Sequence, residues 1–162
     1  MRKLELKITF TEFDGLDELI SEEQELVLIA EEALKSAYAP YSHFKVGAAI
    51  LLEDGQIFSA NNQENAAYPS GLCAERVAIF HAVAQNPGIP VKSIAVTAKS
   101  EDFVMKSPVS PCGACRQVIA EYEKLYKQKI RIIMKGESNK IIIAESIEDL
   151  LPLTFHEEQL KK

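Results

Sequence analysis

The three cysteines of the chain fall into two short motifs, and each motif stands at the start of a predicted helix. Cys73 opens the sequence Cys-Ala-Glu-Arg, and Cys112 and Cys115 belong to Pro-Cys-Gly-Ala-Cys. Positions three apart share one face of a helix, so the second motif presents two thiols side by side. If the two helices begin at neighbouring points of the fold, three thiolates converge on one ion, and zinc is the natural occupant of such a site. This convergence constrains the fold more than any other feature of the sequence.

Strand-like and helical segments alternate along most of the chain. Strands are expected where apolar residues alternate or form short runs, and helices where they recur every three or four residues. Asp54 and Gly55 indicate a hairpin, and Pro40 prevents the first helix from continuing. The predicted strands span 4–10, 44–52, 56–60, 93–98, 130–134 and 141–144, and the predicted helices span 22–38, 73–85, 111–126 and 146–151. This order indicates an α/β fold in which helices cover both faces of a mixed sheet.

Length and composition indicate one domain without a membrane span. A chain of 162 residues corresponds to one domain at roughly 100–200 residues per domain. Its longest nearly apolar run, residues 46–52, is far shorter than the roughly 20 residues of a transmembrane helix. Charged residues interrupt positions 2–7, where a signal peptide has its apolar region. We therefore expect a cytoplasmic protein with no membrane partner.

The net charge of −6 disfavours a dedicated nucleic-acid binder, because neutralising phosphates requires a basic surface. The acidity belongs to the N-terminal part, since residues 1–32 hold ten acidic and three basic side chains. That leaves a charge of +1 for residues 33–162. The charge is therefore mild support for a protein without a nucleic-acid partner.

Three thiolates on one zinc ion leave an open position for water, which is the arrangement of a catalytic zinc site. The odd number of cysteines cannot close as intramolecular disulfides, which also favours metal binding. A structural zinc ion needs a fourth protein ligand, and none of His43, His81 and His156 has the spacing of a paired ligand. A structural zinc ion and buried apolar thiols are the alternatives that the cysteines alone leave open.

The residues beside Cys73 suit hydrolytic chemistry. Zinc lowers the pKa of bound water from 15.7 to about 7, but three thiolates give the site a net negative charge that opposes this effect. Helix N-termini, each equivalent to roughly half a positive charge, and Arg76 offset that charge. Glu75 lies two residues after Cys73, where it can face the zinc-bound water and transfer protons. A positioned acid–base group of this kind typically accelerates a reaction about 10²–10⁴-fold.

Five ordered motifs make the sequence resemble the cytidine deaminase family, in particular its small homotetrameric class. They comprise residues 38–42 with 44 and 46–49, residues 62 and 64–68, residues 73–76, residues 110–117, and residues 150–155. The resemblance implies a three-layer α/β/α sandwich with a five-stranded mixed sheet. Residues 21–162 would form the catalytic domain and residues 1–20 an N-terminal extension, whose strand at 4–10 adds to a sheet edge, covers an interface or has no catalytic part.

The resemblance also implies a role for each motif. Cys73, Cys112 and Cys115 are the implied ligands of one zinc ion per subunit. Glu75 would carry protons between water, the ring N3 and the departing amine, and Arg76 would offset the thiolate charge. The other implied site residues are Asn62 and Glu64 at the ribose hydroxyls, Phe44 against the pyrimidine, Ala74 and Ser110 at the base edge through their backbones, Tyr68 at the subunit interface, and Phe155 in a neighbouring subunit's pocket.

The implied activity is hydrolytic deamination of cytidine and 2′-deoxycytidine to uridine and 2′-deoxyuridine, with release of ammonia, as in pyrimidine salvage. The implied assembly is a homotetramer with shared active sites. Two alternatives stay open, namely a deaminase of a modified nucleoside or of a base in RNA, and a zinc-stabilised binding module without turnover. Glu75 argues against the binding module, because a binder needs no proton carrier.

Overall fold

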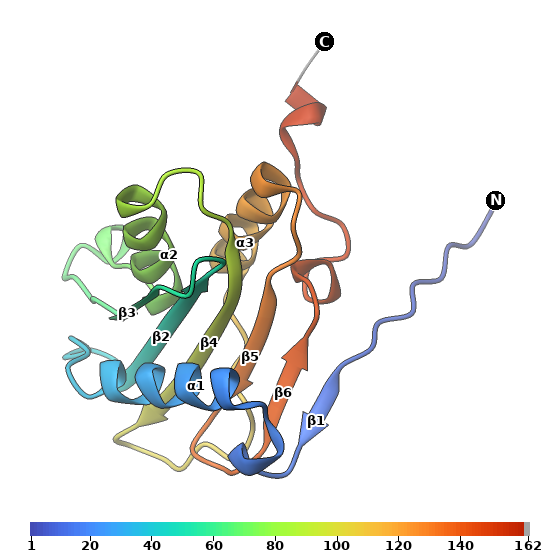
Figure 1. Cartoon of the computed structure of the whole chain (residues 1–162). Coiled ribbons are helices and arrows are strands. Elements are labelled where there is room, and N and C mark those ends of the chain that lie inside the picture. Colours follow the sequence, from blue (N-terminus) through green and yellow to red (C-terminus); the bar gives the residue numbers. More distant parts are fainter. Residues whose placement is uncertain (161–162) are drawn as a thin grey trace.

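The computed structural model describes residues 1–160, and their strands form one six-stranded mixed sheet (Figure 1). The strands are β1 (Thr11–Phe13), β2 (Phe44–Leu52), β3 (Ile57–Asn61), β4 (Val91–Ser100), β5 (Arg131–Lys135) and β6 (Ile141–Ala144). The helices are α1 (Ser21–Leu34), α2 (Ala74–Gln85) and α3 (Gly113–Tyr126), with 3-10 turns at Leu16–Glu18, Tyr68–Ser70, Ile147–Asp149 and Glu157–Leu160. The order across the sheet is β1-β6-β5-β4-β2-β3, in which β4 and β5 are parallel and the other neighbours are antiparallel.

Two apolar clusters cover the two faces of this sheet. On one face, Leu26 of α1 packs in a cluster with Ala49 of β2. On the other face, Ile79 of α2 and Ile119 of α3 pack in a cluster with Ile50 of β2. Adjacent residues of a strand point to opposite faces, which is why Ala49 and Ile50 belong to different clusters. The predicted three-layer α/β/α sandwich is therefore confirmed.

Helix α1 lies so close to β2 that the strand has no side chain at the point of contact. A Cβ atom added to Gly47 would lie 2.0 Å from the carbonyl oxygen of Ala30 and 2.8 Å from the backbone nitrogen of Leu34. The backbones of α1 and β2 therefore pack directly against each other. This contact fixes the position of the strand that begins at Phe44.

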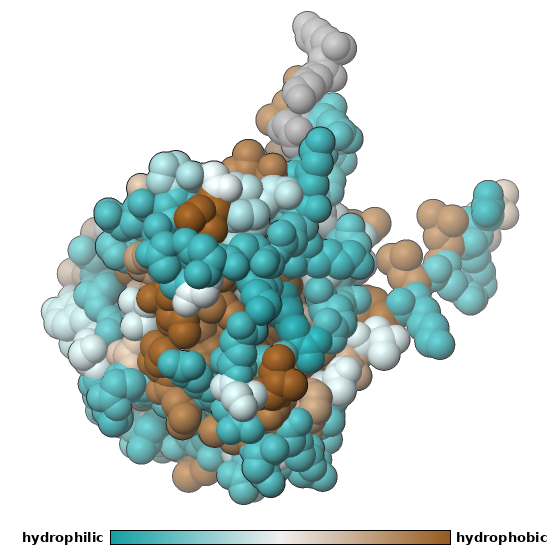
Figure 2. Space-filling view, viewed as in Figure 1, coloured by the Kyte–Doolittle hydropathy of each residue, from teal (hydrophilic) through white to brown (hydrophobic). Residues whose placement is uncertain are grey.

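The predicted strand at residues 4–10 is wrong, and so is the five-strand count. Residues 1–10 form no strand, and all of them are exposed. Figure 2 shows this segment standing clear of the body, with apolar and polar residues both in the open. The strand of this region is β1, three residues long, which pairs with β6 and makes the sixth strand. The alternation of apolar and polar residues predicts a strand with one buried face. Residues 4–10 are exposed, however, because they do not pack against an apolar surface of their own chain.

Other predicted boundaries differ where long-range pairing takes over from local pattern. The first helix ends at Leu34 rather than at 38, because the following chain turns to meet the segment after β3. There the Tyr38 N–H donates to the Asn62 carbonyl at 3.1 Å, and the Glu64 N–H donates to the Tyr38 carbonyl at 2.9 Å. Strand β4 is longer than predicted at both ends, and the last predicted helix is a single 3-10 turn. None of the helices within residues 1–160 has the length and apolar character needed to cross a membrane.

Candidate zinc and active site

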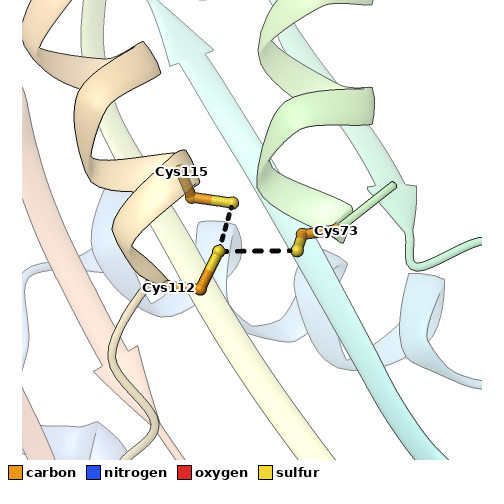
Figure 3. Close-up of side chains that lie close together, drawn as sticks. All are labelled: Cys73, Cys112 and Cys115. Carbon is orange, nitrogen blue, oxygen red and sulfur yellow. Dashed lines mark hydrogen bonds between the residues drawn. The ribbon is translucent and has the colours of Figure 1, made fainter. Parts of the chain in front are cut away.

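The three cysteine thiols lie together where two helices begin (Figure 3). Cys73 is the N-cap of α2, Cys112 is the N-cap of α3, and Cys115 lies in the first turn of α3. The Sγ atoms of Cys73 and Cys112 are 3.7 Å apart, and those of Cys112 and Cys115 are 3.5 Å apart. Three sulfurs held tetrahedrally at 2.3 Å from one zinc ion are separated by about 3.8 Å. The cluster thus has nearly the spacing of a zinc site.

The electrostatics of the sulfur cluster also favour a bound cation. A hydrogen bond from the Cys115 thiol, together with those from Arg76 and Cys112, lowers the pKa of Cys73 to about 5. The same bond to Cys73, with burial and the nearby carboxylate of Glu75, raises the pKa of Cys115 far above its usual value. One sulfur therefore ionises readily at the expense of another. A divalent cation is what allows three such sulfurs to ionise together.

Arg76 places a positive charge beside the cluster. Its Nη2 atom lies 3.7 Å from the Cys73 sulfur, and this hydrogen bond is the main reason that the pKa of Arg76 is raised. The guanidinium thus stays charged beside the thiolate. Its Nε atom is buried without a hydrogen-bond partner within residues 1–160.

Glu75 is a buried carboxyl group in the first turn of α2, with 4% of its surface exposed. Burial is the main reason that its pKa is raised, and the negative charge of Cys73 raises it further. A raised pKa brings a carboxyl group closer to exchanging protons at neutral pH. This environment agrees with a proton carrier and differs from that of an exposed glutamate that forms a surface ion pair.

A cavity of about 540 Å³ opens over the cluster. Of the predicted site residues, the following line it: Cys73, Cys112, Glu75, Phe44, Asn62, Glu64, Tyr68 and Ser110. Ala74, between Cys73 and Glu75 in the sequence, is completely buried and is not among the lining residues. Phe155 is not among the lining residues, and 53% of its surface is exposed. Cys115 and Arg76 do not line the cavity but contact the sulfurs of Cys112 and Cys73.

Asn62 is held by strand β2. Its Oδ1 accepts a hydrogen bond from the Val46 N–H at 2.8 Å, and its Nδ2 donates to the Phe44 carbonyl at 2.9 Å. Both ends of the amide are therefore fixed by the backbone. This bracing sets the orientation of Asn62 at the cavity wall.

Glu64 is held by two residues that the sequence motifs did not assign to the site, Tyr41 and Ser42. The Tyr41 N–H donates to Glu64 Oε2 at 2.8 Å, and the Ser42 hydroxyl donates to Oε1. Partial desolvation acts to raise the pKa of Glu64, but the hydrogen bonds from Ser42 and Tyr41 outweigh it and lower the pKa. Glu64 is therefore an ionised acceptor at neutral pH. Both missed residues belong to the motif at 38–42, which is the one sequence signal that points to them.

The histidines stay outside the metal cluster. Within residues 1–160, the group of potential metal ligands at this site consists of the three cysteines alone. His43 faces Asp102, with 3.3 Å between Nδ1 and Oδ1, and His81 packs edge-on against Phe58. Within the described residues, neither a histidine nor a carboxylate joins the three cysteines as a fourth ligand. A catalytic zinc site has three protein ligands and keeps its fourth position open, so this ligand set fits one.

Comparison with known proteins agrees with this geometry. Residues 20–130 match the family described as the cytidine and deoxycytidylate deaminase zinc-binding region. The chain belongs to the cytidine deaminase family. In this family member, the zinc-binding residues are Cys73, Cys112 and Cys115.

The likeness to individual cytidine deaminases extends over most of the chain. A cytidine deaminase of Sporosarcina psychrophila is 42% identical over 137 residues, which are 85% of this chain and 93% of the relative. A crystal structure of cytidine deaminase from Burkholderia pseudomallei is 40% identical, with a TM-score of 0.71, and the match covers 81% of this chain and 97% of that one. The Mycobacterium tuberculosis structure has 31% identity and a TM-score of 0.63 over 83% of this chain and 97% of that one. A blasticidin-S deaminase of Bacillus cereus is 34% identical over 81% of this chain and 90% of its own length.

Proposed function

We propose that this protein is a zinc-dependent hydrolase that converts cytidine and 2′-deoxycytidine to uridine and 2′-deoxyuridine, releasing ammonia. The observation that carries the proposal is the placement of three thiols at two helix starts, beside the buried Glu75 and beneath a cavity lined by Asn62 and Glu64. One zinc ion per chain supplies a Lewis acid that makes hydroxide available from water at neutral pH. The reaction consumes one water molecule, breaks the C4–N bond and forms the C4 carbonyl.

The residues of the chain divide the remaining work. Glu75 takes a proton from the attacking water and gives it to the ring N3, and it then takes the proton of the new C4 hydroxyl and gives it to the departing amine. Phe44 packs against the pyrimidine, and the backbones of Ala74 and Ser110 hydrogen-bond to the base edge. Asn62 and the ionised Glu64 accept hydrogen bonds from the ribose hydroxyls. A site with such acceptors discriminates against substrates that lack the hydroxyls more strongly than an apolar pocket does. Tyr68, at the cavity wall, supports the site where subunits meet.

The charge of the cavity favours nucleosides over nucleotides. Two carboxyl groups, Glu64 and Glu75, line it, and no lysine or arginine within residues 1–160 does so. At an effective dielectric constant of about 20, two unit charges about 6 Å apart repel by about 3 kcal/mol. A 5′-phosphate therefore meets repulsion at Glu64 without a compensating cation.

A substrate panel tests the function and this preference together. We expect loss of cytosine absorbance with cytidine and deoxycytidine, and kcat/KM lower by about 100-fold or more with deoxycytidine 5′-monophosphate, given that repulsion. The panel includes cytosine, adenosine and a zinc measurement on the same sample. Glu64→Gln is the companion variant, which should narrow the gap between nucleoside and nucleotide. Equal turnover of both substrates, or no turnover of cytidine by zinc-loaded protein, would count against the proposal.

A second candidate is deamination of a modified cytosine nucleoside. The likeness to a blasticidin-S deaminase, at 34% identity, is the observation that favours it. Adding blasticidin S to the substrate panel separates the two, because the preferred substrate has the higher kcat/KM. Deamination of a base in RNA has less support, since no cationic side chain of the described residues lines the cavity.

Phe155 is the basis of a proposed shared active site. It is not among the residues that line the cavity of its own chain, it is exposed, and its carbonyl accepts a hydrogen bond from Gln117 Nε2 at 2.9 Å. We propose that it completes the pocket of a neighbouring subunit in a homotetramer. The alternative is that Phe155 is an ordinary exposed aromatic residue without a role in binding.

Replacing Phe155 with alanine should raise KM for cytidine about tenfold or more, because a buried aromatic side chain contributes roughly 1.5–3 kcal/mol. Leu125→Ala removes another exposed apolar side chain, on the outer part of α3, and is the matched control. Mass measurement in solution accompanies the kinetics. A fully active monomer would overturn the proposed sharing.

We also propose a domain boundary and a cellular compartment. The family match begins at residue 20, which supports residues 1–20 as an extension and 21–162 as the catalytic domain. Zinc-binding thiols must stay reduced, which supports a cytoplasmic location.

A further inference from the structure

Four polar side chains along one face of α3 hold the C-terminal segment, residues 146–158. They are Arg116 and Gln117 and, one heptad later, Glu123 and Lys124. Residues seven apart share a helix face, so Arg116 lies in line with Glu123 and Gln117 in line with Lys124, in two adjacent rows. Their partners are, in the same order, the Leu150 carbonyl at 2.8 Å, the Phe155 carbonyl at 2.9 Å, the Ser146 hydroxyl at 2.9 Å and the Glu158 carboxylate at 2.8 Å. The C-terminal segment is thus attached to the helix that carries two of the zinc ligands.

Arg116 differs from the other three because it also reaches toward the active site. Its Nε donates to the Pro111 carbonyl at 2.7 Å, and its Nη2 donates to the Ser110 hydroxyl at 2.9 Å. Ser110 lines the cavity. Within residues 1–160 the Ser110 hydroxyl has no other hydrogen-bond partner. One guanidinium therefore joins the cavity loop to the Leu150 carbonyl, which lies 34 residues after Arg116 in sequence.

The chemistry of these contacts suits arginine and no other side chain. A guanidinium is planar and always charged, and its donors point in fixed directions, so three acceptors are held in one rigid arrangement. A lysine at the same position keeps the charge but is a point donor on a flexible stem. Hydrogen bonds from a charged donor are also stronger than neutral ones.

We propose that Arg116 is a positioning residue, which sets the Ser110 backbone against the substrate's base edge and couples that loop to the C-terminal segment. The inference rests on the proposed function, because the base edge is that of cytidine. Small displacements of a group that orients the substrate are costly, since a shift of about 1 Å can lower a rate about 100-fold. Arg116 itself does not line the cavity and touches no reacting atom.

The first test compares Arg116→Lys with Lys124→Gln, which removes the ion pair with Glu158, another contact between α3 and the C-terminal segment. For Arg116→Lys we expect KM for cytidine to rise about tenfold, as for the loss of a hydrogen bond to a charged group, with zinc still near one per chain. Lys124→Gln should leave KM unchanged. A merely structural role for Arg116 would reduce the amount of active enzyme, and thus apparent kcat, without moving KM. That result would overturn the proposal.

A double-variant cycle asks whether Arg116 acts through the Ser110 hydroxyl. Contacting residues show non-additive effects, so adding Arg116→Lys to Ser110→Ala should raise KM little beyond the larger single effect. Two independent, multiplying effects would overturn the proposed contact.

Amide hydrogen exchange tests the coupling without relying on turnover. In Arg116→Lys we expect faster exchange in both 108–112 and 150–155, and unchanged exchange in β6. If the unmodified, zinc-loaded chain fails to deaminate cytidine, the proposed function is lost, yet this measurement still decides the coupling. Unchanged exchange in either segment would overturn it.

Discussion

Replacing Glu75 with glutamine is expected to abolish most of the deaminase activity while leaving zinc in place. Glutamine has nearly the same shape but cannot accept and release a proton, and a positioned acid–base group is typically responsible for about 10²–10⁴-fold in rate. Glu75 is not one of the clustered metal ligands, so the thiols should still bind one zinc ion per chain. The measurement is kcat for cytidine together with a metal count.

Glu23→Gln is a matched control for this variant. Glu23 is also a buried glutamate, but it lies on α1 at the other face of the sheet and pairs with Arg131 at 2.6 Å. Its substitution should lower stability without changing kcat per folded molecule. If Glu75→Gln kept wild-type kcat, another group would have to carry the protons, and the assigned role of Glu75 would be wrong.

Replacing Cys112 with serine should remove both zinc and activity. Zinc binds a hydroxyl far less readily than a thiolate, and two remaining cysteines cannot hold the ion in the same way. We expect metal content to fall from one ion per chain to nearly none, with loss of cytidine turnover. Atomic emission and the absorbance assay on one sample measure both effects.

The fold should survive this loss in weakened form. In small peptides, structural zinc contributes roughly 10–16 kcal/mol of binding free energy that is also folding free energy. Here two apolar clusters pack independently of the ion. We therefore expect a lower Tm with most far-UV circular dichroism retained. Chelation of the unmodified protein should have the same effect and should be reversed by added zinc, whereas a metal-free sample with full turnover would refute the zinc mechanism.

The elements that sequence predicts best are those whose causes are local. The β2–β3 hairpin lies where Asp54 and Gly55 indicate a turn, and Gly55 has the positive φ of 87° that glycine accepts. The helix starts at Cys73 and Cys112 are predicted within one or two residues, because apolar periodicity and Pro111 mark them. Local patterns therefore place the thiols at two helix starts, but their convergence also needs the two helices to begin near each other, which the fold of the sheet determines.

The features that sequence reasoning missed depend on distant partners. The end of α1 is set by the pairing of Tyr38 with the segment after β3. The residues near 34 carry no sequence signal for this pairing. The apolar pattern at 4–10 indicates which face of a strand would be buried, but it does not indicate whether another element packs against that face. Arg116 and Gln117 belong to the motif at 110–117, but their partners at Leu150 and Phe155 are visible only in the folded chain.

The contact between α1 and β2 restricts what evolution can do at one position. Because the missing Cβ of Gly47 would fall inside the backbone of the helix, even the smallest mutational step there displaces an entire layer of the sandwich. The exposed positions of α1, in contrast, tolerate substitutions more readily, because their side chains point to solvent. Divergent descendants of this chain should therefore preserve a glycine at 47 whatever substrate they come to accept, since the constraint arises from architecture and is independent of catalysis.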